Sequence, residues 1–488
     1  MAKRMSAVRI GPSLRSLTGA LRSVRTRHLG FAFFWLWMTM FMHGPQLIAW
    51  SPGAVEAAVG PLSFAPLLSL TLSSAATMLV VALAAKNRSL VQLRGVRLAA
   101  VVLTVAGTVA RAFSGEAGLL GWELGPVVMS TAAAGIAGAG TALTMVVWGE
   151  YYGCVGVRRS AVYIVLSVLL SSLLYLVAHR LGAPLQVAIM CACPFLAVGL
   201  LTRSRKEVGE LFPHAEESAP LASLPPKLVL CSVACGVITG LVSGSSALMV
   251  DADLTGSDLA GPLAGTAVAL LFLAGLACFG EDLDRGFTYR PTLVVMVVGC
   301  ALLPFAALDR GTQVGTAIVG GGYLLFYMLT WIVYADIAHR SKVPGAPVFA
   351  WGRLFAAFGY GAGMLLGAAG LRVLGPDLFT PALISCVTMG ALVLTAVFVL
   401  DEKGLAPHTS SGGAPSREDP AAALAQSCSL TKRETEVLAH LLKGRSLARI
   451  AADLGLSYNT VNSHVANLYA KCGVHSRQEL IDKAEGAR

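Results

Sequence analysis

The side chains that could carry out covalent or metal chemistry are few, and their spacing does not support it. The ten cysteines are scattered through or beside apolar segments and near the C-terminus. Cys231 and Cys235 are one helical turn apart, but no His, Asp or Glu accompanies them, so they lack the spacing of metal ligands. The chain also contains no phosphate-binding glycine loop, no Ser/His/Asp set and no receiver-type carboxylate cluster. We therefore expect no cofactor, no metal and no enzymatic activity.

Polar side chains within the apolar segments are the candidates for non-covalent binding of an unknown small-molecule ligand. Polar groups are costly inside a membrane and tend to be functional there. The five candidates are His43, Gln46, Glu123, Tyr323 and Tyr327. An alternative for the aromatic residues, including Trp331, is a belt at the membrane interface. Arg353, close to one end of the eleventh apolar segment, is expected to extend to the lipid headgroups.

Residues 430–480 form the only long segment that is neither apolar nor loop-like. Thr431 and Glu434 have the spacing of a capping box, which predicts the start of a helix that ends at Gly444. Apolar residues at helical spacing predict a second helix over 446–454 and a third from Tyr458 to Lys471, separated by a tight turn. This arrangement is typical of a helix-turn-helix.

The same segment resembles the DNA-binding domain of LuxR-type (NarL/FixJ) transcription regulators. The matching residues are Leu430, Thr431, Arg433, Glu434, Glu436, Val437, Leu438, Gly444, Ile450, Ala451, Leu454, Ser457, Thr460, Val461, His464, Val465, Lys471, Val474, Ser476, Arg477, Glu479 and Leu480. The resemblance implies that the helix from Tyr458 enters the major groove of double-stranded promoter DNA. It also implies that the last helix, with Leu480 and Ile481, pairs two copies into a homodimer on DNA.

The family's pattern assigns DNA contacts to particular residues of this sequence. Asn462, Ser463 and Ala466 would face base edges; Thr460, Asn467 and Lys471 would face phosphates; Lys443 and Arg445 lie just before the second helix. Two positions depart from the family, which usually carries Lys or Arg at 462 and Glu or another polar residue at 449. The base preference therefore does not follow from the resemblance.

The composition of the rest of the chain predicts a membrane protein. Of 488 residues, 55% are hydrophobic and 13% are charged, with a mean hydropathy of +0.69, whereas a soluble domain has about 25% charged residues. Residues 1–28 hold seven of the basic residues and no acidic one, directly before an apolar run that is too long for a signal peptide. This predicts a cytoplasmic N-terminus, either as a helix on an anionic leaflet or as a mobile basic arm.

From residue 29 to residue 400 about twelve apolar segments are long enough to cross a hydrocarbon core of about 30 Å. Their centres lie near Met38, Ser73, Val105, Gly135, Leu169, Met190, Thr239, Leu270, Gly299, Leu325, Gly361 and Gly390. Arg and Lys are more frequent in the loops that would be internal than in those that would be external. The sequence thus predicts a multi-pass protein of the bacterial inner (cell) membrane, embedded in the lipid bilayer with both termini cytoplasmic.

Twelve spans with a longer central loop over residues 202–227 resemble the major facilitator superfamily, which implies two six-helix halves. The segment Gly280–Arg285 partly matches the family's Gly-x-x-x-Asp-Arg gating motif, while the first-half equivalent, residues 86–97, lacks the Asp. An ordinary solvated loop is the alternative for Asp284 and Arg285. The Gly- and Ala-rich run Ala132–Gly140 predicts close helix packing in lipid.

The sequence therefore predicts an all-α chain, a polytopic helical membrane bundle with a C-terminal four-helix DNA-binding domain. The expected divisions are a basic arm (1–28), a twelve-span domain (29–400), a flexible linker (401–427) and a LuxR-type helix-turn-helix domain (428–488). The Pro-, Gly- and Ser-rich linker would span about 30 Å. We interpret the chain as a membrane-integral one-component transcriptional regulator that senses a signal. The alternative is a facilitator-type transporter with a regulatory DNA-binding tail.

Overall fold

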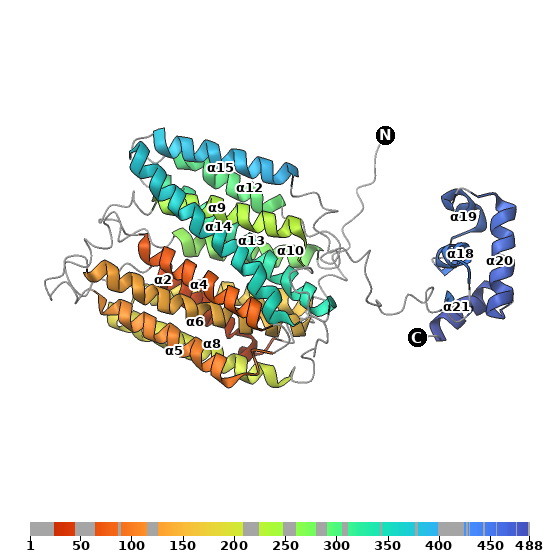
Figure 1. Cartoon of the computed structure of the whole chain (residues 1–488), viewed down its shortest axis with the longest axis horizontal. Coiled ribbons are helices and arrows are strands. Elements are labelled where there is room, and N and C mark those ends of the chain that lie inside the picture. Colours follow the sequence, from red (N-terminus) through yellow and green to blue (C-terminus); the bar gives the residue numbers. More distant parts are fainter. Residues whose placement is uncertain are drawn as a thin grey trace. The chain divides into compact units, whose positions relative to one another are not determined.

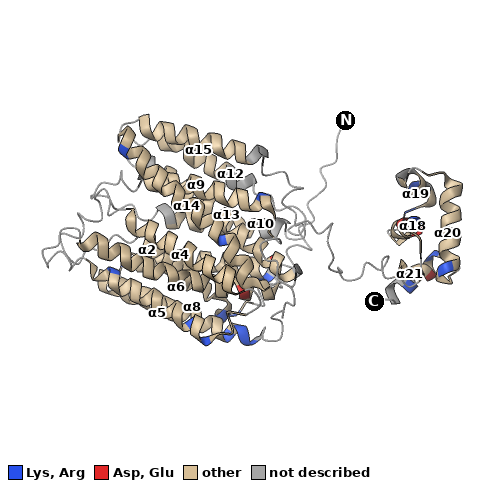
Figure 2. Ribbon diagram, in the orientation of Figure 1, with Lys and Arg blue, Asp and Glu red and all other residues tan. Residues whose placement is uncertain are grey.

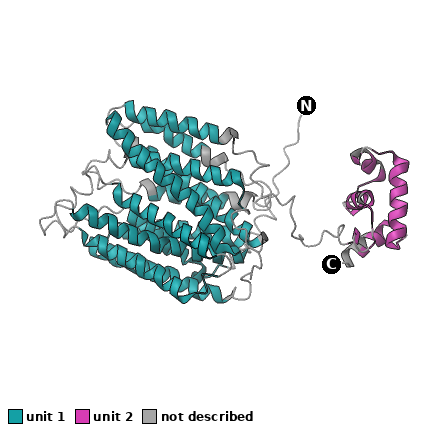
Figure 3. Ribbon diagram, viewed as in Figure 1, with its two compact units in different colours: residues 1–408 teal, residues 409–488 magenta. Residues whose placement is uncertain are grey.

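The computed structural model describes residues 24–43, 64–85, 89–114, 125–207, 224–246, 260–279, 290–304, 311–341, 344–375, 379–398, 424–425, 428, 430–442, 445–454, 456–474 and 476–486. The chain divides into two compact units, residues 1–408 and 409–488, shown in teal and magenta in Figure 3. Each unit has its own hydrophobic core. Within the described ranges all regular structure is helical.

Twelve helices of 13 residues or more occupy the described part of the first unit (Figure 1). They are α2 (Phe31–His43), α4 (Ala65–Ala84), α5 (Arg94–Ala112), α6 (Gly125–Val155), α7 (Val157–Ala178), α8 (Ala183–Ser204), α9 (Pro226–Ser246), α10 (Ala260–Phe279), α12 (Arg290–Leu302), α13 (Gly311–Ser341), α14 (Gly345–Leu374) and α15 (Phe379–Phe398). Each contains one of the twelve predicted centres. Eight of them, α4 to α9, α13 and α14, are long and apolar enough to cross a membrane. The predicted polytopic bundle is confirmed.

The helices group into two sets of six, α2 to α8 and α9 to α15. Within the first set α6 packs against α4 and α5; within the second, α14 packs against α9 and α13 against α12. Two contacts between the sets are related by position, because the second helix of each set meets the fifth helix of the other: α4 meets α14, and α10 meets α7. This exchange gives the bundle the two-half organisation expected from the sequence.

Glycine contacts join α9 and α14 along most of their length. Gly236, Gly240 and Gly244 of α9 recur every four residues and face backbone atoms of α14, while Gly359, Gly363 and Gly367 of α14 face backbone atoms of α9. A Cβ at Gly240 would overlap the carbonyl oxygen of Tyr360, and one at Gly363 would overlap that of Val237. Small residues with this spacing let helix backbones approach closely in lipid. We call these six glycines the glycine seam.

The predicted close packing of the Gly- and Ala-rich run in α6 is confirmed. Gly138 lies against the backbone of Leu70 in α4, and Gly140 lies against Thr104 in α5. Leu70 and Thr104 are both buried. Larger side chains at these glycines would separate α6 from both neighbours.

Positive charge gathers mostly near the ends of the bundle helices (Figure 2). At the start of α5, Arg97 lies within electrostatic reach of Arg205, which begins η4 (Arg205–Glu207) after α8. In η1 (Thr26–Leu29), burial together with the charges of Arg27, Arg25 and Arg159 lowers the pKa of His28 to about 4. The first six helices therefore have one basic end, as a membrane protein has on its cytoplasmic side.

The described part of the second unit contains four helices: α18 (Lys432–Leu442), α19 (Leu447–Leu454), α20 (Tyr458–Cys472) and α21 (Arg477–Gly486). Its core is aliphatic, and each of the four helices contributes to it. The fully buried members are Val437, Leu438, Ile450, Val461, Leu468 and Leu480. Burying such a side chain contributes about 1.5–3 kcal/mol, which accounts for a stable domain of this small size. The predicted inward-facing residues Leu447 and Leu454 pack against the edge of this core.

Candidate functional sites

Helix α20 presents one apolar and one polar face. Val461, Val465 and Leu468 are buried in the core of the domain. The helix begins at Ser457, whose Oγ accepts from the Thr460 backbone N–H at 3.1 Å, and ends at Gly473 in the left-handed region (φ +63°). The exposed face holds Asn459, Asn462, Ser463, Ala466 and Asn467. Amide and hydroxyl groups on one helix face can bond base edges in a major groove.

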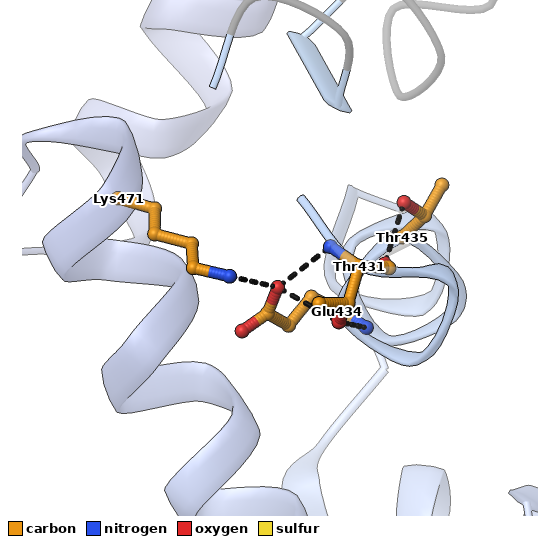
Figure 4. A network of polar contacts seen from close by, with 4 residues as sticks. All are labelled: Thr431, Glu434, Thr435 and Lys471. Carbon is orange, nitrogen blue, oxygen red and sulfur yellow. Dashed lines mark hydrogen bonds and ion pairs between the residues drawn. The ribbon is translucent and has the colours of Figure 1, made fainter. Parts of the chain in front are cut away.

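The predicted capping box at the start of α18 is confirmed and extended by a lysine from α20 (Figure 4). The Glu434 carboxylate accepts from the Thr431 backbone N–H at 2.7 Å and from the Thr431 hydroxyl at 2.8 Å. It also accepts from Lys471 Nζ at 2.7 Å. The hydrogen bond from Lys471, followed by those from Thr431, lowers the pKa of Glu434 to about 2. Lys471, predicted to face phosphate, is thus held at its amine by an ion pair that fixes α20 on α18.

The other predicted phosphate contacts lie around the exposed face of α20. The Thr460 hydroxyl is 2.7 Å from Ser457 Oγ, so it is already engaged in the helix cap. Arg445 is exposed before α19, and Arg449 is exposed on α19 itself. Lys443 lies outside the described residues. The structure therefore leaves Arg445, Arg449 and the uncharged side chains of α20 exposed on the same domain.

Leu480, predicted together with Ile481 to pair two domains, is fully buried in the core of its own domain. Two basic side chains of α21 hold the helix in place: Arg477 donates to the Leu441 carbonyl at 2.7 Å, and Lys483 donates to the Cys472 carbonyl at 2.6 Å. Both satisfy carbonyls at helix C-termini. The side chain of Ile481 lies outside the described set.

Two of the five predicted ligand residues fall on described side chains of the bundle. Tyr323 and Tyr327 lie one helical turn apart on α13, with ring centroids 6.3 Å apart. The Tyr327 hydroxyl lies 3.0 Å from the sulfur of Met145 on α6. The side chains of His43, Gln46 and Glu123 lie outside the described residues.

Arg353 departs from its predicted position. Its side chain turns inward from α14, and the residue is only 6% exposed. The guanidinium lies 3.5 Å from the centroid of the Tyr327 ring, and its Nη1 is 3.4 Å from the Thr330 hydroxyl. Extension to lipid headgroups is therefore wrong for Arg353. The preceding residue, Gly352, packs against the Tyr334 ring of α13.

The comparisons with known proteins match the helical bundle and the C-terminal domain separately. Residues 428–484 match the family of bacterial regulatory proteins, luxR family. Over 56 residues the chain is 46% identical to the Fimbriae Z protein of Salmonella typhimurium, which covers 12% of this chain and 27% of that protein. Over 86 residues it is 45% identical to the transcriptional regulatory protein UhpA of the same species, 17% of this chain and 44% of that protein. The chain thus spans less than half the length of these relatives.

Solved structures resemble the helical bundle. A bacterial homologue of the iron transporter ferroportin, in its outward-facing state with soaked iron, matches with a TM-score of 0.54 and 14% identity, covering 78% of this chain and all of that chain. A Major Facilitator Superfamily transporter, FucP, in the outward conformation, has a TM-score of 0.49 at 11% identity, over 77% and 98% of the two chains. At these identities the likeness concerns the fold alone. The chain is therefore a multi-span membrane protein of transporter-like fold that carries, at residues 428–484, a helix-turn-helix domain of the luxR family of bacterial regulators.

Proposed function

We propose that this chain is a membrane-integral one-component transcriptional regulator. Its bundle senses a small molecule, and its C-terminal domain binds promoter DNA as a dimer. The observation that carries the proposal is the exposed polar face of α20, in a domain that also exposes Arg445 and Arg449, on the same polypeptide as twelve bundle helices. The proteins and structures that match the chain are regulators and transporters. We propose accordingly that the chain has no enzymatic activity.

The proposed location is the bacterial inner membrane with both termini in the cytoplasm. The basic end formed by η1, the start of α5 and the end of α8 supports this orientation, because cytoplasmic loops are enriched in Arg and Lys. Reporter fusions after Arg97, Lys206 and Arg488 are expected to report cytoplasm, and a fusion near Asp253 the external side. An external signal from the C-terminal fusion would end the regulator proposal.

A second function is favoured by the bundle itself. Its fold is shared with the ferroportin homologue over all of that chain, so a working transporter with a regulatory DNA-binding tail is the alternative. Iron is not carried over as a substrate, because a 14% identity establishes fold and no binding residue.

The deciding experiment is sequencing of DNA that co-purifies with the full-length protein from membranes. A regulator is expected to recover a small set of promoter fragments that share one sequence, and the set or its yield should change with the sensed metabolite. Solute uptake into vesicles without specific DNA recovery would favour the transporter.

A further inference from the structure

Arg353 is a buried cation inside a membrane bundle, and its neighbours are rings rather than carboxylates. Within the described residues no Asp or Glu oxygen lies within 4.0 Å of its guanidinium. Its guanidinium instead contacts the Tyr327 ring at 3.5 Å and the Thr330 hydroxyl at 3.4 Å. A desolvated charge without a counter-ion is expensive to keep, and ionisable groups in membrane spans tend to serve ligands.

The Tyr327 ring that Arg353 contacts belongs to a chain of aromatic contacts between four helices. The ring centroids of Tyr327 and Trp331 are 6.1 Å apart, with 28° between the ring planes. The ring of Trp35, on α2, lies edge-to-face with that of Tyr327, with 5.1 Å between centroids. Trp331 in turn contacts Phe349 of α14 at 5.0 Å and Phe31 of α2 at 4.7 Å. Phe31 lies 5.7 Å from Trp148 of α6. We call these residues, together with Arg353, the aromatic centre.

Hydrogen-bond donors in the aromatic centre lack acceptors. Three nitrogen atoms are buried without a hydrogen-bond partner: Nε of Arg353 and the indole Nε1 of Trp331 and of Trp148. Trp331 and Trp148 are fully buried. The Tyr327 hydroxyl donates only to the thioether of Met145, which is a weak acceptor. Because buried polar groups are nearly always paired, the unpaired Nε of Arg353, in a guanidinium without a carboxylate beside it, indicates a missing acceptor of negative charge.

We infer that the aromatic centre binds a small aromatic carboxylate, with the carboxylate on Arg353 and the ring against Tyr327 and Trp331. A carboxylate matches the forked donors of a guanidinium with two planar oxygens. A flat apolar body fits among rings that interact through offset or edge contacts. This inference rests on the proposed function, since it gives the chemical class of the molecule that the bundle senses.

The test is isothermal titration calorimetry on the full-length protein in lipid nanodiscs. The probes are benzoate and 1-naphthoate, with benzamide as the uncharged match and acetate as the match without a ring. Both aromatic carboxylates are expected to bind, and benzamide and acetate to bind at least about 10-fold more weakly, since hydrogen bonds to charged groups contribute this much or more. Equal binding of benzoate and benzamide, or no binding of either aromatic carboxylate up to its solubility limit, would overturn the inference.

Variants of Arg353 separate ligand binding from folding. Arg353→Met is expected to lose the binding of benzoate by about 10- to 100-fold, while the thermal unfolding midpoint stays equal or rises, because replacing a buried charge by an apolar side chain removes its desolvation cost. Arg353→Lys, which keeps the charge without the fork, should retain part of the affinity. Unchanged benzoate affinity in a folded Arg353→Met protein would refute the assignment.

Arg111 offers the matched control. Its guanidinium lies 3.9 Å from the Phe41 ring centroid and its Nε is also unpaired, but Nη1 donates to the Phe41 carbonyl at 3.1 Å. Arg111→Met should leave benzoate affinity unchanged, and an equal loss in both variants would contradict a specific site.

None of these readouts uses DNA. Binding that depends on Arg353 in a protein that recovers no promoter would disprove the proposed regulator alone, and promoter recovery without benzoate binding would disprove the inference alone.

Discussion

The side chains on α20 have two expected roles, contact with DNA bases and attachment of α20 to α18. Asn462 is exposed, whereas the amine of Lys471 is 2.7 Å from the Glu434 carboxylate. A lysine in an ion pair with a buried acid gives up that contact when it moves to a phosphate. Contact of Lys471 with a DNA phosphate, as predicted, would therefore replace its ion pair with Glu434 in the free domain.

Substitutions at these two residues are expected to have different effects on DNA binding. Asn462→Ala should change which operator is preferred, because an amide that bonds adenine at two points contributes about 1–3 kcal/mol of discrimination. Lys471→Ala should weaken all sequences alike and reduce the salt slope by about one. Fluorescence anisotropy with a set of single-base operator variants measures both. Asn459→Ala, at another exposed position of α20, is the control, and a uniform loss in all three variants would refute the assignment of roles.

The pair of Glu434 and Lys471 also makes stability depend on pH. The pKa of Glu434 is about 2 in the folded domain, below its ordinary value near 4.5, so the folded state favours the charged form. The stabilisation is complete above pH 4.5 and is lost as pH falls from there through about 2. Urea unfolding of residues 409–488 should show this loss, and Glu434→Gln should remove it. Glu436→Gln is the control, since Glu436 forms only an exposed pair with Arg433; an equal effect would contradict the prediction.

At the scale of elements, the glycine seam gives the clearest expectation. A Cβ at Gly363 would overlap the Val237 carbonyl, whereas one at Gly370 on the same helix would meet nothing within 4 Å. Gly363→Ala should therefore destabilise the bundle by about 1–3 kcal/mol, the usual cost of overpacking. Gly370→Ala should leave it unchanged. Thermal unfolding of the two purified proteins tests this, and equal midpoints would show that α9 and α14 are not in backbone contact.

The sequence predicted which elements exist better than it predicted which elements meet. Twelve apolar runs are enough to find twelve helices, since length and hydropathy are local properties. The glycine seam could not be assigned in the same way, because Gly240 and Gly244 indicate that some backbone comes close without indicating that it is α14. Arg353 failed for a related reason, since its distance from a helix end says nothing of the direction in which its side chain turns. The role of Leu480 could not be read from the sequence either, because one apolar residue fits a domain core and a dimer surface equally well.

At the scale of the whole molecule, pairing of two tethered domains is the expected route from bundle to DNA. One domain offers few basic side chains around α20, so a single copy should hold DNA weakly, and tethering two copies to associated bundles would change how often they meet. Residues 409–488 fused to an unrelated dimeriser should bind operator tightly, the free domain only at high concentration, and the domain with Ile481→Glu not at all.

Leu480→Ala distinguishes surface from core in the same assay. Because Leu480 is fully buried, its truncation should cost about 2–5 kcal/mol of folding free energy, measured by urea unfolding, whereas Ile481→Glu should leave the domain folded. Equal operator binding by the fused, free and Ile481→Glu forms would refute the dimer proposal.

Backbone contact along the glycine seam also determines what can move in the bundle. Carbonyl oxygens, rather than flexible side chains, occupy the space beside these glycines. Because such a contact leaves no room for adjustment, we expect α9 and α14 to move together as one rigid pair of helices. Arg353 is attached to that body, and Gly345, the first residue of α14, lies against the backbone of Glu150 on α6. We therefore expect a displacement of Arg353 to move Gly345 as well. Gly345 contacts α6 near its C-terminal end, in the other half of the bundle.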